Sequence, residues 1–225
     1  MTQTAKIIAK ELVPPIVLRL FKSFRNSQTV SYNNGSEQTS EYYDQKASAS
    51  DGFRIHYSKT EYYPFWSVIA DRIQCVETKS LLEIGCGGGQ FAALIRDKGI
   101  TKYLGFDFSS SLIALAKKAC PDLDFVIADA LKTDLFYTHD YDTVVTTEFL
   151  EHIERDLEVI QKIRKGTRFY GSVPNFPWIS HVRHFNSVQE VYDRYSEYFH
   201  SFRVDTFFSN HDNAKVFYLL EGVKL

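Results

Sequence analysis

The sequence predicts an α/β domain in which helices cover both faces of a mostly parallel sheet whose last strand is antiparallel. Three observations support this fold class. From about residue 80 to residue 200, short apolar runs typical of buried strands alternate with amphipathic patterns of helical period. Acidic residues end three of these runs, and a glycine-rich turn follows the first. Two later apolar runs lie a hairpin apart and predict an antiparallel pair.

Length and composition indicate a globular protein. The 225 residues suffice for one α/β domain, and the hydrophobic content of 44% and charged content of 24% are ordinary. A net charge of −2 argues against a large nucleic-acid footprint. The three cysteines, Cys75, Cys86 and Cys120, show no C-x-x-C spacing and predict reduced thiols and a cytoplasmic location. No signal peptide or membrane-spanning stretch is predicted.

The first fifty residues differ in character from the rest. Residues 6–25 predict a basic amphipathic helix with a step at Pro14-Pro15. Such a helix fits peripheral contact with the inner face of a membrane, or packing on its own domain or in a homodimer. Residues 27–51 are polar and predict a linker, or a lid that orders with ligand. We therefore expect two parts: residues 1–50, and a catalytic domain over 51–225.

The glycine-rich turn follows the first predicted strand, Leu81 to Ile84, and precedes a helix from Gln90 to Lys98. Strand, glycine turn and helix open a nucleotide-binding unit, in which glycine lets the backbone approach a ligand. A dinucleotide fingerprint would place its third glycine at position 90, where Gln90 stands. The observed Glu-x-Gly-x-Gly-x-Gly, with glycines at 85, 87 and 89, resembles motif I of the class I S-adenosylmethionine (SAM) dependent methyltransferases.

Acidic residues at strand ends extend this resemblance. Glu83 suits the methionine ammonium of SAM, and Asp107, 22 residues after Gly85, stands where such units hold ribose hydroxyls. Asp129-Ala130 resembles the methyltransferase segment in which an acid accepts a hydrogen bond from the adenine amino group. The predicted cofactor-binding residues are Glu83, Gly85, Gly87, Gly89, Asp107, Phe108, Asp129, Ala130 and Glu148.

The other elements follow from periodicity and from helix-start and turn signals. A helix over 61–75 places apolar residues in register, and class I methyltransferases carry a helix there beside the SAM cleft. The resemblance implies a Rossmann-like sheet of seven strands, the last one antiparallel. Strands are predicted over 102–107, 123–130, 141–146, 168–173, 202–208 and 215–220, and helices from 109 to before Pro121, over 148–163 and over 188–198.

A cluster of titratable residues follows the fourth strand. Glu148, Glu151 and His152 stand at i, i+3 and i+4, so a helix beginning at Glu148 would place them on one face. Two carboxylates and an imidazole can hold Mg²⁺ or Mn²⁺. Glu-x-x-Glu-His resembles the ubiquinone-pathway O-methyltransferases and the small-RNA 3′-terminal 2′-O-methyltransferases, and implies that these residues are metal ligands. In the RNA enzymes a second histidine further along completes the site, and His181 and His184 are the candidates for it here. A metal-free acid/base role remains open and is favoured, because Mg²⁺ usually recruits more oxygen ligands.

Two further histidines follow the fifth strand. His181, Arg183 and Phe185 match a His-x-Arg-x-Phe segment of the quinone-pathway group, and His184 lies between them. The predicted catalytic residues are His152, His181 and His184, one of which removes or orients the acceptor proton.

The predicted function is SAM-dependent O-methylation of a hydroxyl on a small metabolite, a sugar or a cell-envelope glycan precursor. An RNA 2′-O-methyltransferase with a metal site is one alternative, disfavoured by the charge balance. A nicotinamide-dependent oxidoreductase would share Gly85, Gly87 and Asp107. It does not account for Gly89, Asp129-Ala130 and the cluster at 148–152 together. A catalytically inactive partner subunit would have lost the acids of the pocket, which are all present.

Overall fold

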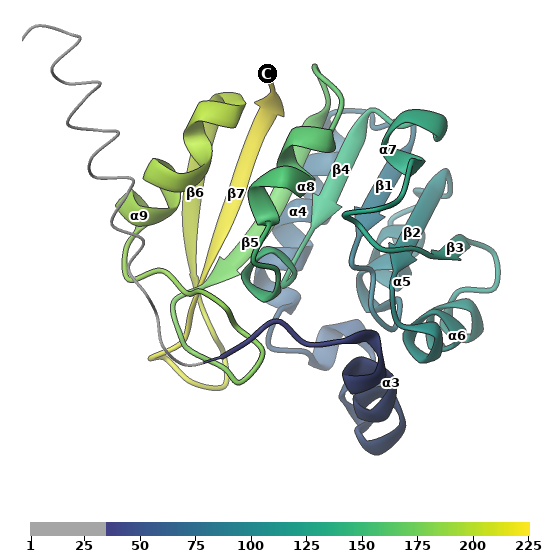
Figure 1. The fold of residues 1–225 in the computed structure, drawn as a ribbon. Coiled ribbons are helices and arrows are strands. Elements are labelled where there is room, and N and C mark those ends of the chain that lie inside the picture. Colours follow the sequence, from purple (N-terminus) through teal and green to yellow (C-terminus); the bar gives the residue numbers. More distant parts are fainter. Residues whose placement is uncertain (1–34) are drawn as a thin grey trace, which may run out of the picture. The chain divides into compact units, whose positions relative to one another are not determined.

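The structure is a computed structural model that describes residues 35–225 (Figure 1). The amphipathic helix predicted over residues 6–25 and the first part of the polar segment lie outside the described residues. Within 35–225, no helix has both the length and the apolar character needed to cross a bilayer.

The centre of the domain is a seven-stranded sheet of order β3-β2-β1-β4-β5-β7-β6. Strands β1 to β5 are parallel, and β7 pairs antiparallel with both β5 and β6. This topology confirms the predicted fold class. The strands are β1 Leu81–Ile84, β2 Tyr103–Asp107, β3 Asp124–Ile127, β4 Thr143–Thr146, β5 Arg168–Pro174, β6 Phe199–Phe208 and β7 Val216–Lys224.

Helices cover both faces of the sheet, and each face has its own apolar core. Helices α4, α5 and α6 contribute to one core, and α7, α8 and α9 to the other. Figure 1 shows α8 and α9 on the near face and α4 behind the sheet. The helices are α3 Ser40–Ala49, α4 Tyr63–Cys75, α5 Gln90–Asp97, α6 Ser110–Ala119, α7 Leu135–Thr138, α8 Asp156–Lys162 and α9 Val188–Tyr195. Short 3₁₀ turns are η1 Asp51–Phe53, η2 Tyr57–Lys59, η3 Leu150–His152 and η4 Ser196–Tyr198.

The central strands are apolar because both of their faces are covered. Every residue of β1 and β4 is buried. Because β1, β2 and β4 are parallel neighbours, their carboxyl ends meet at one edge of the sheet. Ligands of open α/β sheets bind in the crevice outside this edge.

The prediction of a helix that begins at Glu148 is wrong. Glu148 adopts a left-handed backbone with φ of 53°, which a right-handed helix cannot accommodate. The one-turn η3 follows, and α8 begins only at Asp156. Glu148, Glu151 and His152 therefore do not share the face of a regular helix.

Helix α3 occupies part of the segment predicted as a polar linker. Its Asp44 carboxylate accepts hydrogen bonds from the Ser109 hydroxyl at 2.6 Å and from the Ser111 amide at 2.8 Å. Ser111 lies in the first turn of α6, so Asp44 joins α3 to that turn. Residues 40–49 thus pack on the domain that follows them.

Candidate active site

A cavity of about 400 Å³ lies at the carboxyl edge of the parallel strands. Its walls include the glycine turn after β1 and the segments that follow β2, β3, β4 and β5. Most of the predicted site residues line it, namely Glu83, Gly85, Gly87, Asp107, Phe108, Asp129, Ala130, Glu148, His152 and His181. Gly89, Glu151 and His184 are not among its lining residues.

The glycine turn has two different steric requirements. Gly85 has φ of 71°, and a Cβ there would lie 2.3 Å from the ring of Phe149, which also lines the cavity. Gly89 has φ of 80°, and a Cβ there would lie 2.9 Å from Cα of Ala116 in α6. Gly85 therefore shapes the cavity, whereas Gly89 allows α5 and α6 to approach.

Asp107 holds the glycine turn against the end of β2. Its Oδ2 accepts a hydrogen bond from the Gly87 amide at 3.1 Å, and its Oδ1 accepts one from the Ser109 amide at 2.9 Å. Burial raises the pKa of Asp107 to about 6, although these amides oppose the rise. The carboxyl is thus preorganised where the resemblance implies a ribose.

Two more acids line the cavity, one buried and one bonded within its own turn. Glu83 is 3% exposed, and burial raises its pKa to about 8. Asp129 lies beyond the end of β3, accepts a hydrogen bond from the Leu131 amide at 2.8 Å and pairs with Lys132 at 2.8 Å. Asp129 therefore makes the hydrogen bond and the ion pair of its own turn, whether or not it also contacts an adenine.

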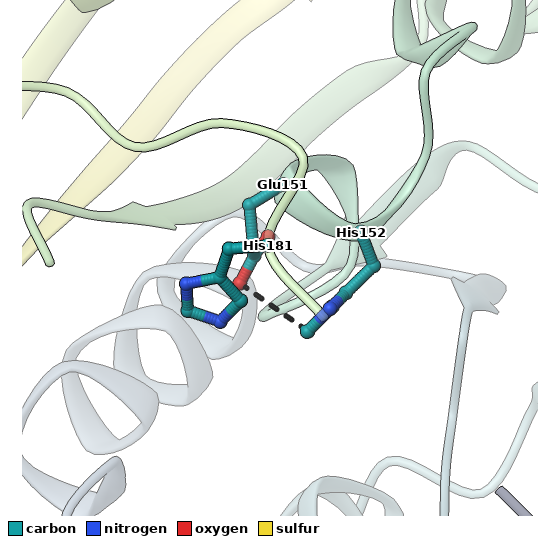
Figure 2. Close-up of side chains that lie close together, drawn as sticks. All are labelled: Glu151, His152 and His181. Carbon is teal, nitrogen blue, oxygen red and sulfur yellow. Dashed lines mark ion pairs between the residues drawn. The ribbon is translucent and has the colours of Figure 1, made fainter. Parts of the chain in front are cut away.

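Glu151, His152 and His181 form a compact cluster next to the cavity (Figure 2). One side-chain nitrogen or oxygen from each lies within 4.8 Å of the others. Glu151 Oε1 is 3.8 Å from His152 Nε2, the contact drawn as a dashed line in Figure 2. His152 comes from the turn after β4 and His181 from the loop after β5, so the fold brings together residues 29 positions apart.

Backbone carbonyls fix the tautomers of both histidines. His152 Nδ1 lies 2.8 Å from the Ser180 carbonyl, and His181 Nδ1 lies 3.0 Å from the Phe176 carbonyl. Since a carbonyl only accepts, each Nδ1 carries the hydrogen and each Nε2 carries a lone pair. Burial lowers the pKa of His152 to about 3 and that of His181 to about 4, so both rings are neutral near pH 7.

Glu151 completes the cluster as a buried acid. It is 0% exposed, and within the described part of the chain neither of its side-chain oxygens has a hydrogen-bond partner. Burial and the neighbouring Glu148 raise its pKa well above the ordinary range. An ionised Glu151 would offer only acceptor oxygens. The cluster of Glu151, His152 Nε2 and His181 Nε2 would then consist of acceptors alone.

Glu148 lies beside Glu151 and is also bonded to Ser172. Its Oε1 accepts a hydrogen bond from the Ser172 hydroxyl at 2.8 Å, and its amide donates to the same oxygen of Ser172 at 2.9 Å. Burial raises its pKa to about 8. The group that the structure brings together is Glu151, His152 and His181. It lacks Glu148 of the predicted set and includes His181, one of the two candidates for the second histidine. His184 is buried outside the cavity wall.

The cluster fits the cation that the resemblance implies. Two imidazole nitrogens with free lone pairs and one carboxylate are donors that divalent transition metals accept. The Nδ1 hydrogen bonds to backbone carbonyls are the outer contacts that orient metal-binding histidines. The orphaned oxygens of Glu151 are the observation that favours this fit.

Several lining residues escaped the sequence analysis. Tyr43 of α3 contacts the rings of Phe108 and His152, at centroid distances of 5.5 Å and 6.2 Å. Lys46 of the same helix also lines the cavity. The adjacent tyrosines at 42–43 were the visible signal, but no local pattern connects them with residues 65 and 109 positions after Tyr43.

The fold and the site define a Rossmann-like class I methyltransferase architecture: a parallel sheet with an inserted antiparallel strand, a glycine turn and acids at the carboxyl edge. Residues 81–171 match the family model described as a methyltransferase domain. The chain is 30% identical over 96 residues to a protein named as a methyltransferase, 235L of Invertebrate iridescent virus 6. That alignment covers 40% of this chain and 34% of the relative, so the chain spans about a third of the relative's length.

Solved structures share the fold at low identity. The N-methyltransferase NodS from Bradyrhizobium japonicum, in complex with S-adenosylhomocysteine (SAH), superposes with a TM-score of 0.59 at 11% identity, over 81% of this chain and 97% of NodS. The [4+2]-cyclase SpnF gives 0.62 at 13% identity, over 85% and 99%. The methyltransferase domain of bacterial CtHen1 gives 0.54 at 16% identity, over 71% and 97%. Residues 81–171 therefore match a methyltransferase domain, and the fold is one that solved methyltransferase structures share.

Proposed function

We propose that this protein transfers the methyl group of SAM to a hydroxyl oxygen of a small metabolite, a sugar or a cell-envelope glycan precursor. The observation that carries the proposal is the position of two neutral histidines with free Nε2 lone pairs on the cavity that also contains the glycine turn and Asp107. An acceptor O–H group supplies the donor that these lone pairs lack.

Three parts of SAM would each meet their own residues in the cavity: the ribose, the methionine ammonium and the adenine. Asp107 would accept hydrogen bonds from the ribose hydroxyls, and Glu83 would face the methionine ammonium. Asp129 and Ala130 would contact the adenine, with Phe108 beside it. An ammonium near Glu83 would favour its ionised form and lower the raised pKa of that carboxyl.

The histidines would act on the acceptor. As the oxygen attacks the methyl carbon, the carbon–sulfur bond breaks with its electron pair and the sulfonium becomes the neutral thioether of SAH. The methylated oxygen would then carry an excess proton, which His152 or His181 accepts through Nε2. Even an imidazole whose pKa is depressed to about 3 or 4 can accept it, because an oxonium is a much stronger acid than an imidazolium.

Glu151, His152 and His181 would hold the cation implied by the resemblance. A cation there would lower the pKa of the acceptor hydroxyl. The neutral state of both imidazoles suits either role of the cluster, since the same Nε2 lone pair accepts a proton or binds a metal.

Calorimetric titration with SAH and with NAD tests the cofactor. Binding of SAH without binding of NAD supports the proposal, and binding of NAD alone would replace it with the oxidoreductase alternative. Transfer is then measured with labelled SAM against panels of phenols and sugars. His152→Ala should slow transfer by roughly a hundredfold or more while leaving SAH affinity nearly unchanged. His200→Ala, at an exposed position of β6, is the matched control.

We further propose, from sequence, a cytoplasmic location with peripheral membrane contact through residues 6–25, and a homodimer as the competing role for the same segment. Arg19, Lys22 and Arg25 flank its apolar stripe of Ile16, Leu20 and Phe24. RNA as the acceptor is disfavoured by the net charge of −2.

A further inference from the structure

We infer that Arg183 is a positioning residue that fixes the turn bearing His152 against the loop bearing His181. The inference rests on the proposed role of the two histidines in hydroxyl methylation. They project from segments that follow different strands, β4 and β5, and neither segment is part of a long helix. Their relative position therefore depends on contacts between the two segments.

The guanidinium of Arg183 binds the turn directly. Its Nη1 donates hydrogen bonds to the carbonyls of Leu150 and Ile153, and its Nη2 donates to the Glu154 carbonyl at 2.9 Å. These carbonyls belong to η3 and to the break before α8. They need outside donors, because the turn is too short to satisfy them itself.

Two more contacts join the same segments. The Val182 amide donates to the Glu151 carbonyl at 2.8 Å, a contact that lies one residue from each histidine. His152 Nδ1 donates to the Ser180 carbonyl at 2.8 Å. Residues 180–183 thus make five hydrogen bonds to residues 150–154. Arg183 supplies three of them.

The buried carboxylate of Asp156 pairs with the guanidinium of Arg183. Asp156 is 0% exposed and lies 3.5 Å from Arg183 Nη1. Arg194 of α9 donates to both Asp156 oxygens, at 2.9 Å and 2.6 Å, and the Tyr195 hydroxyl donates at 2.7 Å. Helix α9 therefore anchors Asp156, and Asp156 orients Arg183.

Arg183 acts at a distance from any ligand. Its side chain is 11% exposed, and it is not among the residues that line the cavity. Its planar fork serves several carbonyls and a carboxylate at once, which the single ammonium of a lysine cannot do. Arg183→Lys should therefore keep the charge but lose part of the positioning, and Arg183→Gln should lose both.

The test uses the full chain without ligand, labelled with ¹⁵N-histidine, and compares long-range ¹H–¹⁵N spectra of the wild type and the variants near pH 7. In the wild type, His152 and His181 should show the Nδ1–H tautomer and remain neutral near pH 7. In Arg183→Gln, an Nε2–H signal should appear for His152 or His181, because the carbonyls that accept their Nδ1 hydrogens are no longer held in place. Arg183→Lys should give a weaker Nε2–H signal.

Arg72→Gln is the matched control. Arg72 is partly buried and pairs with Asp205 at 2.7 Å and with Glu221 at 3.0 Å, both on the hairpin of β6 and β7. This variant should lose thermal stability while keeping wild-type histidine signals. Wild-type histidine signals in Arg183→Gln, or in Arg183→Lys if the former does not fold, would overturn the inference. SAH binding is measured in parallel, so failure of the cofactor proposal is distinguished from failure of this one.

Discussion

The hydroxyl of Tyr103 donates a hydrogen bond to Glu83 Oε2 across the backbone of Gly105. Glu83 and Gly105 are register partners on β1 and β2, and Tyr103 lies two residues before Gly105 on the same face. A Cβ on Gly105 would lie 2.5 Å from the Tyr103 hydroxyl oxygen. The glycine therefore leaves the space through which a buried tyrosine fixes an acid of the cavity wall.

This contact predicts the pH dependence of SAH binding. Burial raises the pKa of Glu83 to about 8, and the Tyr103 hydrogen bond opposes that rise. If ionised Glu83 faces the ligand ammonium, affinity should increase from about pH 6 to about pH 8 in the wild type. In Tyr103→Phe the pKa of Glu83 should be higher still, so the calorimetric curve should move to higher pH. Coincident curves would remove Tyr103 from cofactor binding; Tyr170→Phe, a buried tyrosine of β5, is the control.

Asp107→Asn should weaken SAH binding by about 1–3 kcal/mol, the magnitude of lost hydrogen bonds to a charged acceptor. The variant keeps the size of the side chain but loses one of the two acceptor oxygens that hold the amides of Gly87 and Ser109. Asp142→Asn is the control, because Asp142 binds the Lys79 amide and does not line the cavity. Equal affinities in calorimetry for Asp107→Asn and the wild type would reject the ribose assignment.

Cation binding should depend on Glu151 and His181 rather than on Glu148. The first two lie in the compact cluster, whereas Glu148 is bonded to Ser172. After treatment with EDTA, stabilisation by Mn²⁺ or Zn²⁺ in a thermal-shift assay should persist in Glu148→Gln and vanish in Glu151→Gln and His181→Ala. SAH affinity should not respond to EDTA. Loss of the cation effect in both Glu148→Gln and Glu151→Gln, with its retention in His181→Ala, would restore the ligand set predicted from sequence.

The contribution of Glu148 to the free energy of unfolding should fall between about pH 4.5 and about pH 8. Glu148 has a folded pKa of about 8 against an ordinary 4.5, so the folded state binds more protons between these values. Its contribution to stability is complete below pH 4.5 and is lost as the pH rises through about 8. Glu148→Gln should reduce the pH-dependent loss measured by urea unfolding. Glu158→Gln, an exposed position of α8 paired with Arg155, should keep it.

Removal of residues 1–25 should reduce co-sedimentation with anionic liposomes, because the segment contains the basic flank of the predicted amphipathic helix. A Lys22→Glu, Arg25→Glu variant of the full chain should have the same effect, and neutral liposomes serve as the control. Equal sedimentation of full-length and shortened protein would favour packing or dimerisation, which analytical ultracentrifugation of both forms would detect.

The sequence predicted the sheet and the glycine turn because those signals are local. Leu81 to Gly89 contains the strand and the turn in one stretch, and the helix begins at the next residue. The turn after β4 could not be predicted in this way. Its conformation depends on Ser172 and Arg183, which lie 24 and more residues later and bond its backbone. Glu-x-x-Glu-His spacing alone favoured a regular helix that these distant contacts replace.

Helix α3 also depends on contacts that are distant in the sequence. Residues 40–49 are polar, and their packing depends on the bond between Asp44 and Ser109, 65 positions away. The approach of His181 to Glu151 could be predicted, because the resemblance to the methyltransferase fold implies that the fourth and fifth strands, here β4 and β5, are neighbours in the sheet.

Strand β7 is last in chain order, yet it lies between β5 and β6. While the ribosome synthesises the chain, the edge of β5 has no neighbour on that side until Val216 and the residues after it have emerged. An exposed strand edge of this kind invites pairing with other nascent chains. Messages stalled within the codons for residues 199–224 should therefore yield products that aggregate or require chaperones. Messages with an added linker as long as the exit tunnel after codon 225 should expose a sheet able to close.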